Sequence, residues 1–162
     1  HREIFGDAGD DKIYVQFSYY GGDVHGGDGN DQIYAPVDGY PYANGTRLYG
    51  DAGNDLIVGG AGADIMNGGA GDDMIIGGAE NDLAIYSGRR SDYRIAWDPT
   101  GQQYILTDLR PGSPDGTDVV SGVERFQFRD GIRQATALPA IAVKPIQGTA
   151  GEIGRASCRA RV

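Results

Sequence analysis

Residues 50–85 read GDAGNDLIV GGAGADIMN GGAGDDMII GGAENDLAI, which are four consecutive units of nine residues. Two more units of the same kind, GDAGDDKIY and GGDGNDQIY, begin at Gly6 and Gly26. All six fit G-[GD]-x-[GE]-x-D-x-U-x, in which U is an apolar residue. A disordered acidic linker would show no such period, so the pattern indicates a repeat architecture.

Each unit predicts a turn followed by a short strand. Glycine at the first, second and fourth positions permits positive φ and close backbone approach, so the turn can point carbonyl oxygens inward. The aspartate at the sixth position adds a carboxylate, and oxygen ligands without nitrogen or sulfur suit Ca²⁺. The apolar residue at the eighth position is expected to face the core, because strand side chains alternate between faces.

The charge distribution agrees with a bound cation. The chain has 162 residues, 28 glycines and a net charge of −9, and residues 1–85 hold fifteen acidic residues against three basic ones. Concentrated like charge opposes a compact state unless something neutralises it. The length predicts about one domain. The acidic balance argues against a nucleic-acid partner, and the absence of a long apolar run argues against a membrane span.

Residues 6–85 resemble the RTX, or haemolysin-type, calcium-binding β-roll. The resemblance implies an all-β, right-handed parallel β-roll (a β-solenoid) in which six residues of each repeat turn and three form a strand. It also implies a secreted, extracellular protein that leaves a bacterium unfolded by type I secretion and folds when it meets calcium. We therefore expect a monomeric, calcium-dependent structural module of a larger protein, with Ca²⁺ as its cofactor.

Two degenerate repeats are expected between the clear ones. The eighth-position residues Ile13, Ile33 and Ile57 are separated by gaps that are too long for one unit and too short for three. Each gap fits one altered unit, with its strand kept at Val24 or at Leu48.

Because one coil of such a roll takes two repeats, alternate repeats should stack on the same edge. The sixth positions of the first edge are Asp11, Asp31, Asp55 and Asp73, and those of the second edge are Gly22, Thr46, Asp64 and Asp82. In the family a calcium ion lies between turns of adjacent coils on one edge. The resemblance thus implies three sites between consecutive aspartates of the first edge. It implies one site on the second edge, between Asp64 and Asp82.

Backbone carbonyls are expected to complete each calcium shell, although the sequence does not assign individual oxygens. The candidates are Gly9, Gly27, Gly29, Gly53, Gly60, Gly62, Gly69, Gly71 and Gly78. The remaining turn acids are expected to favour the turn or to be solvated. They are Asp7, Asp10, Asp28, Asp51 and Asp72.

The roll is expected to end near residue 85. Glu80 replaces the fourth glycine of the last unit and the small Ala84 takes its core position, and both changes weaken the Asp64–Asp82 site. Residues 86–136 then predict a small antiparallel β capping segment, with a hairpin formed by 93–97 and 103–107 and a third strand at 123–128. This segment resembles the β-segment that follows the repeats in RTX proteins, and it would cover an aggregation-prone open edge.

The last part of the chain is expected to lie outside the fold. Residues 137–151 are interpreted as a linker. Residues 152–162, EIGRASCRARV, contain the only cysteine, Cys158, and are similar to one translated frame of a sequencing-library adapter. We interpret them as an artefact, and we expect the natural protein to extend beyond both ends of this sequence. Without them the chain has no cysteine, which fits an exported protein held by metal instead of disulfides.

No catalytic motif is present, so the fragment itself is not expected to be an enzyme. HExxH, GxSxG and P-loop patterns are absent, and His25 is expected to be a surface turn residue rather than a metal ligand. Two alternatives stay open for the parent protein. The fragment is either the non-catalytic tail of a secreted protease, lipase, peroxidase or polysaccharide-modifying enzyme, or an adhesin or carbohydrate-binding module. In the latter case an acidic polysaccharide or a host surface is the partner, and Arg89, Arg90 and Arg94 are candidate contacts for an anionic glycan.

Overall fold

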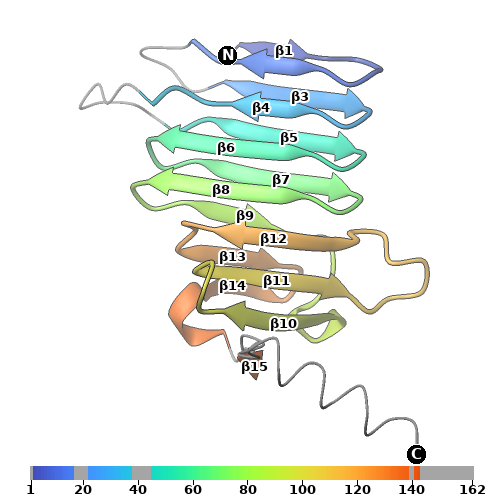
Figure 1. Ribbon diagram of the computed structural model, residues 1–162, viewed down its shortest axis with the longest axis vertical. Helices are drawn as coiled ribbons and strands as arrows, with labels where there is room; N and C mark the ends of the chain where they lie inside the picture. The colour runs from blue at the N-terminus through green and yellow to red at the C-terminus, as the bar shows by residue number, and fades with distance from the viewer. Residues whose placement is uncertain (1, 17–21, 38–44, 139–140, 143–162) are drawn as a thin grey trace, which may run out of the picture.

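The protein is described by a computed structural model that covers residues 2–16, 22–37, 45–138 and 141–142. Two sheets face each other and stack coil upon coil along the long axis of the molecule (Figure 1). The first sheet contains, in spatial order, β1 (Glu3–Phe5), β3 (Asp23–Asp28), β5 (Arg47–Ala52), β7 (Ile65–Ala70), β9 (Leu83–Ile85), β13 (Arg125–Phe128) and β14 (Gly131–Gln134). The second contains β15 (Ile141–Ala142), β10 (Tyr93–Asp98), β11 (Gln103–Asp108), β12 (Thr117–Ser121), β8 (Met74–Ala79), β6 (Leu56–Ala61), β4 (Gln32–Tyr34) and β2 (Lys12–Tyr14). Two single 3₁₀ turns, η1 (Arg90–Asp92) and η2 (Ala135–Ala137), lie outside the sheets.

The first nine strands form the expected parallel β-roll. Successive strands alternate between the two sheets, and each pairs in parallel with the strand two further along the chain. One coil therefore takes two repeats. The degenerate units are confirmed, because Val24 pairs with Leu48 and both side chains are fully buried.

The core of the roll consists of inward-facing side chains that stack along both sheets. Neighbouring strands bring these residues into register, so that Ile33, Ile57 and Ile75 stack on one wall. The opposite wall consists of Val24, Leu48, Met66 and Ala84. Such a thin core buries little apolar surface per residue, so it contributes less to stability than the core of a globular domain of the same length.

The parallel stacking continues beyond residue 85, where the sequence predicted that the roll would end. β12 pairs in parallel with β8, and β13 pairs in parallel with β9. The side chain of Phe126 lies opposite Ala84 in this pairing and is fully buried. The large ring thus occupies the space that the small alanine leaves, so Ala84 is the place where the cap docks.

The predicted antiparallel hairpin is confirmed, since β10 and β11 pair from Tyr93↔Asp108 to Asp98↔Gln103. The structure adds two strands to this segment, β12 and β14, which the sequence analysis did not predict. The linker interpretation is wrong at Ile141–Ala142, which form β15 and pair with β10. The rest of the predicted linker from residue 143 onward, and the predicted adapter segment, lie outside the described residues.

Aromatic rings fill the interior of the cap. Tyr86 contacts Tyr93 and Phe128 with ring centroids 5.2 and 5.8 Å apart, and Tyr104 meets Phe126 at 5.5 Å. Trp97, the only tryptophan, packs on Tyr104 at 4.7 Å. Its fluorescence is therefore a reporter of the folded cap.

No helix within the described ranges has the length and apolar character that a membrane span requires.

Candidate calcium centre in the turns

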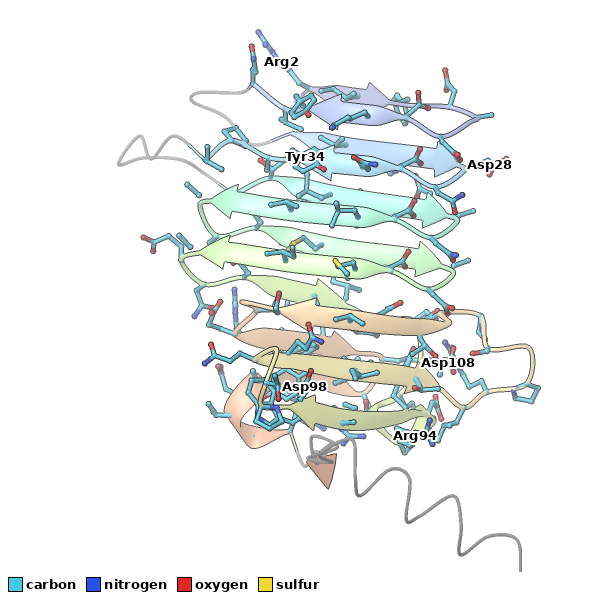
Figure 2. The ribbon with its side chains drawn as sticks, in the orientation of Figure 1. Arg2, Asp28, Tyr34, Arg94, Asp98 and Asp108 are labelled. Carbon is cyan, nitrogen blue, oxygen red and sulfur yellow. The ribbon has the colours of Figure 1, made fainter. Side chains whose placement is uncertain are left out.

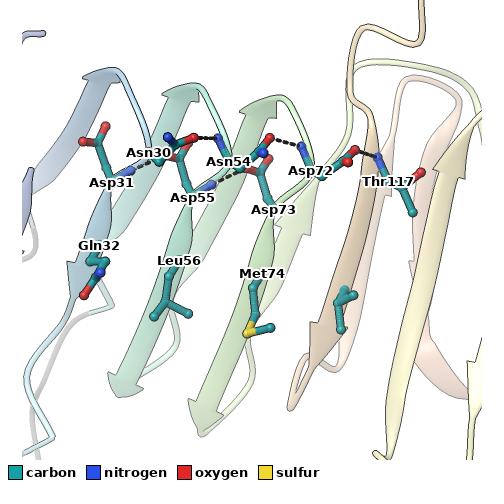
Figure 3. Close-up of a pocket in the computed structure, with 11 residues that line it drawn as sticks. Asn30, Asp31, Gln32, Asn54, Asp55, Leu56, Asp72, Asp73, Met74 and Thr117 are labelled. Atoms are coloured by element: carbon teal, nitrogen blue, oxygen red, sulfur yellow. Dashed lines mark hydrogen bonds between the residues drawn. The ribbon is translucent and has the colours of Figure 1, made fainter. Parts of the chain in front are cut away.

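The aspartates of the first edge form a continuous hydrogen-bonded ladder. The backbone N–H of Asp11 donates to Asp31 Oδ1 (2.8 Å), that of Asp31 to Asp55 Oδ1 (2.7 Å), and that of Asp55 to Asp73 Oδ1 (2.9 Å). Figure 3 shows Asp31, Asp55 and Asp73 side by side, directly before β4, β6 and β8, where they line one pocket. The structure thus brings together each pair of aspartates that the sequence placed on this edge.

The second edge has a shorter ladder of the same kind. The N–H of Thr46 donates to Asp64 Oδ1 (2.6 Å), and the N–H of Asp64 donates to Asp82 Oδ1 (2.8 Å). Thr46 keeps the backbone donor but brings no carboxylate, so only the pair Asp64 and Asp82 offers two carboxylates between adjacent repeat turns. The carboxylates are thus distributed unequally between the two edges.

The second carboxylate oxygen of each ladder residue is buried and has no hydrogen-bond partner among the described residues. These oxygens are Oδ2 of Asp11, Asp31, Asp55, Asp64, Asp73 and Asp82. The side chains of the last five are at most 3% exposed. A buried polar atom without a partner is costly, and a buried charge costs more. Six such atoms at equivalent positions therefore indicate a shared missing partner.

The first-position glycines form the space into which these oxygens point. A Cβ on Gly50 would lie 2.3 Å from Asp55 Oδ2 and 2.4 Å from the carbonyl oxygen of Gly68 in the next coil. A Cβ on Gly26 would meet Asp31 Oδ2 at 2.4 Å and the carbonyl oxygen of Gly50 at 2.7 Å. Two oxygens that converge with no hydrogen between them repel each other unless a cation or proton lies near them. The oxygen atoms, together with the room left because glycine has no side chain, thus fit a hard cation such as Ca²⁺.

The nine glycines expected to supply carbonyl ligands have the backbone conformation that the sequence predicted for the turns. All nine adopt positive φ, from +84° at Gly60 to +136° at Gly29 and Gly53. The close packing of adjacent turns also requires glycine, because a Cβ on Gly53 would lie 1.7 Å from the carbonyl oxygen of Gly29. No cluster of three or more histidine, cysteine or acidic side chains converges within the described part of the chain. Backbone carbonyls would therefore have to provide much of any metal shell.

Burial raises the pKa of four of the ladder carboxyls. Desolvation raises the pKa of Asp55, Asp73 and Asp82 to about 6 and that of Asp64 to about 7, from the ordinary 3.8. Neighbouring carboxylates raise these values further, whereas hydrogen bonds from the next backbone N–H groups lower them.

The buried acids of the cap have a different environment. Asp108, labelled in Figure 2 at the end of β11, contacts Arg110 at 2.6 Å, and Asp115 contacts the same guanidinium at 3.1 Å. Tyr93 also donates its hydroxyl hydrogen to Asp115. None of the six ladder aspartates has an arginine or lysine ion pair within the described ranges. Arg110 thus neutralises Asp108 and Asp115 in the cap, whereas the ladder aspartates have no such cation beside them in the described part of the chain.

These pKa shifts predict how the calcium-free roll responds to pH. The folded-state pKa values lie above the unfolded value, so folding is favoured by protonated carboxyls below pH 4 and this stability is lost as pH rises through about 6 to 7. In a chelator, far-UV circular dichroism should therefore show more β-structure at about pH 5 than at about pH 8. With calcium the order should reverse, because protons compete with the metal for the carboxylates. A calcium-free chain that is more stable at the higher pH would contradict this prediction.

Other turn acids have structural roles, as expected. Asp10 Oδ1 accepts the N–H of Asn30, and Asp72 Oδ1 accepts the N–H of Thr117, each at 2.8 Å. They belong to an exposed fifth-position ladder that also includes Asn30 and Asn54. Because asparagine serves there as well as aspartate, the charge is not required.

His25 differs from the prediction of a turn residue, because it lies within β3. Its ring stacks between Phe5 and Tyr49 with centroids 5.2 and 4.6 Å apart, and Nδ1 lies 2.9 Å from Asp51 Oδ2. This aromatic stack between neighbouring coils gives the side chain a packing role on the outer face.

Sequence reasoning missed two members of the ladders. The N–H of Asp73 donates to Asp118 Oδ1 (2.9 Å), and the N–H of Asp82 donates to Glu124 Oε2 (2.8 Å). The stretch 116–120, GTDVV, carries the G-x-D-x-U signal, with Gly116 at φ +61° and a would-be Cβ 2.1 Å from the carbonyl oxygen of Gly71. That half-repeat was recognisable, whereas Glu124 was not.

The comparison with known families agrees with the geometry. Four copies of the RTX calcium-binding nonapeptide repeat match the chain, over residues 3–15, 20–35 and 49–84. Searches of curated proteins and of solved structures each found no significant match. The matched segments contain all six ladder aspartates of the repeats and end before Asp118 and Glu124. The protein therefore carries RTX calcium-binding nonapeptide repeats, wound into a parallel β-roll.

Proposed function

We propose that the turns between residues 6 and 85 bind Ca²⁺ between adjacent coils and that the roll folds as it binds. The observation that carries this proposal is the set of six buried Oδ2 atoms, each without a described hydrogen-bond partner and each aimed at a first-position glycine. Asp11, Asp31, Asp55 and Asp73 would hold the metal on the first edge, and Asp64 and Asp82 on the second. Glycine carbonyls of the same turns would complete the shells. Bound calcium supplies the positive charge that these buried oxygens lack.

Coupling of binding to folding follows from the balance of forces in the roll. The core is thin, and the stacked carboxylates repel one another when they are ionised without metal. A ligand that binds only the folded state adds stability that grows with its concentration. Extracellular calcium modules bind at roughly 10⁻⁴ to 10⁻³ M. At such affinity the roll would stay unfolded at cytosolic calcium and fold outside the cell.

The biological role proposed for the fragment is that of a structural module in a larger secreted protein. The repeat region is a calcium-binding structural element, and the repeat type is typical of secreted proteins. Export in an unfolded state would then be followed by folding at external calcium.

A calcium titration of the whole chain tests the function. Far-UV circular dichroism should show a cooperative gain of β-structure between about 0.1 and a few millimolar calcium. Magnesium should fail to replace it, because Mg²⁺ requires a tighter octahedral shell and gives up its water reluctantly. Trp97 fluorescence should follow the same transition, since the cap docks on the roll. A chain that is fully folded in chelator, or one that binds no calcium at saturation, would overturn the proposal.

A further inference from the structure

The turn that joins β12 to β13 stacks directly on the last repeat turn. Ser121 pairs with Ile76, so Gly122 follows in register with Gly77. The N–H of Arg125 donates to the carbonyl oxygen of Asp82 (3.1 Å), as the N–H of Leu83 does to Asp64 one coil earlier (2.9 Å). Residues 122–124 therefore occupy the place of another repeat turn, although they number three instead of six.

The oxygens at this junction repeat the geometry of the turns inside the roll. A Cβ on Gly77 would lie 1.9 Å from the carbonyl oxygen of Gly122 and 2.6 Å from Asp82 Oδ2. The equivalent Cβ on Gly59 would meet the carbonyl oxygen of Gly77 at 2.3 Å and Asp64 Oδ2 at 2.8 Å. Asp82 is fully buried, and its Oδ2 has no hydrogen-bond partner in the part of the chain that the structure describes.

Glu124 takes the sixth position of this shortened turn. Its Oε2 accepts the N–H of Asp82 (2.8 Å), which is the bond that a ladder aspartate makes with Oδ1. Its extra methylene lets a carboxylate reach the ladder from a turn that has lost three residues. The nearby Arg125 guanidinium donates to the carbonyl oxygen of Asn81 (3.1 Å), and it forms no ion pair with Asp82 or Glu124 within the described ranges.

We propose that Asp82, Gly122 and Glu124 form a further calcium site at the junction between the roll and the cap, beyond the repeats that the family comparison matches. This inference rests on the proposed calcium binding by the repeats. The ligands are the Asp82 and Glu124 carboxylates and the Gly122 carbonyl oxygen, with further turn carbonyls or water. Calcium at this place joins β9 to β13 and so fastens the cap to the roll.

Asp118 ends the first-edge ladder in a different way. Its side chain is 2% exposed, and burial raises the pKa of this carboxyl to about 8 from the ordinary 3.8. The three atoms nearest to a Cβ on Gly68 all belong to Asp73, so no carbonyl oxygen of the cap is among them. The paired oxygens that mark the other turns are thus absent at Gly68 among its nearest described neighbours, and the proposal is limited to the second edge.

The test compares E124Q with D72N in the full chain. Both variants remove one negative charge, but Asp72 lies in the exposed fifth-position ladder where asparagine already serves at residues 30 and 54. Equilibrium dialysis should show one fewer calcium ion bound to E124Q at saturation and no loss for D72N. The calcium midpoint of Trp97 fluorescence should rise about tenfold in E124Q, because the cap loses its metal contact. Equal stoichiometry and equal midpoints for both variants would overturn the site.

A direct measurement keeps the proposal testable even if E124Q does not fold. A crystal structure of the unmodified chain grown with calcium should show an anomalous peak bound by Glu124 and the Gly122 carbonyl at about 2.3–2.6 Å. A structure that shows calcium in the repeat turns, but only water or no density at this junction, would overturn this inference alone. A chain that binds no calcium anywhere would overturn the proposed function together with it.

Discussion

Replacing both Asp55 and Asp73 by asparagine should nearly abolish calcium-induced folding. Asparagine keeps an oxygen that can accept the N–H of Asp31 or Asp55, so the ladder of hydrogen bonds can persist. It removes the negative charge, and its NH₂ group replaces the oxygen that points toward the metal. The double variant thus separates loss of metal binding from loss of the hydrogen-bond ladder.

The size of the effect follows from linkage. A site that is filled at a hundred times its Kd adds about 2.7 kcal/mol, so two lost sites remove about 5 kcal/mol. That is comparable to the whole stability of a small domain, which is roughly 5–15 kcal/mol. The calcium midpoint of the circular dichroism transition should therefore rise by far more than about tenfold, and two fewer ions should bind at saturation.

The matched control is the double variant D10N/D72N. It makes the same change in charge at two exposed fifth positions, where Asn30 and Asn54 already take part in the ladder. Its calcium midpoint and stoichiometry should stay close to those of the unmodified chain. If both double variants lose calcium response equally, net charge rather than ligation governs folding, and the assignment of Asp55 and Asp73 as ligands is wrong.

The second large effect is expected from Gly50→Ala. Gly50 does not have a positive φ, so alanine brings no backbone strain of that kind. Its Cβ would however lie 2.3 Å from Asp55 Oδ2 and 2.4 Å from the carbonyl oxygen of Gly68, which is too close for carbon and oxygen. Overpacking of this kind costs about 1–3 kcal/mol or more, and here it also fills the space proposed for the metal. The variant should lose stability and one calcium ion together.

Gly101→Ala is the control for this substitution. Gly101 also lacks a positive φ, and its would-be Cβ meets the movable end of the Gln103 side chain, in the β10–β11 turn. It should change the thermal unfolding temperature little and leave calcium stoichiometry unchanged. If the Gly50→Ala variant binds as many calcium ions as the unmodified chain, the space beside Gly50 does not hold the metal.

The nonapeptide period was sufficient to predict the roll and the stacking of its aspartates along two edges. In-register stacking of parallel strands requires only that equivalent residues recur, and the eighth and sixth positions recur from Ile13 to Ala84 and from Asp11 to Asp82. The two degenerate units could also be placed, because the gaps between isoleucines fix the number of strands.

The same reasoning could not predict how the cap joins the roll. Within the repeats, hydrogen-bonded ladder residues are 18 to 24 positions apart, whereas Asp73 and Asp118 are separated by 45 positions and Asp82 and Glu124 by 42. The β10–β11 hairpin is inserted between them, which breaks the period. A Glu in a turn of three residues also bears no likeness to the repeat.

The sequence by itself determined the repeats between residues 6 and 85, their inward-facing apolar residues and the two edges of carboxylates. These properties depend on the nine-residue period and on the alternation of side chains along a strand. Both features follow from residues that are close together in the sequence. Only the tertiary structure decided which carboxylate oxygen accepts a backbone N–H and which stays buried without a partner. It also decided that the cap extends both ladders. Both outcomes depend on which turn lies against which, and contacts between distant segments are set by packing of the whole chain.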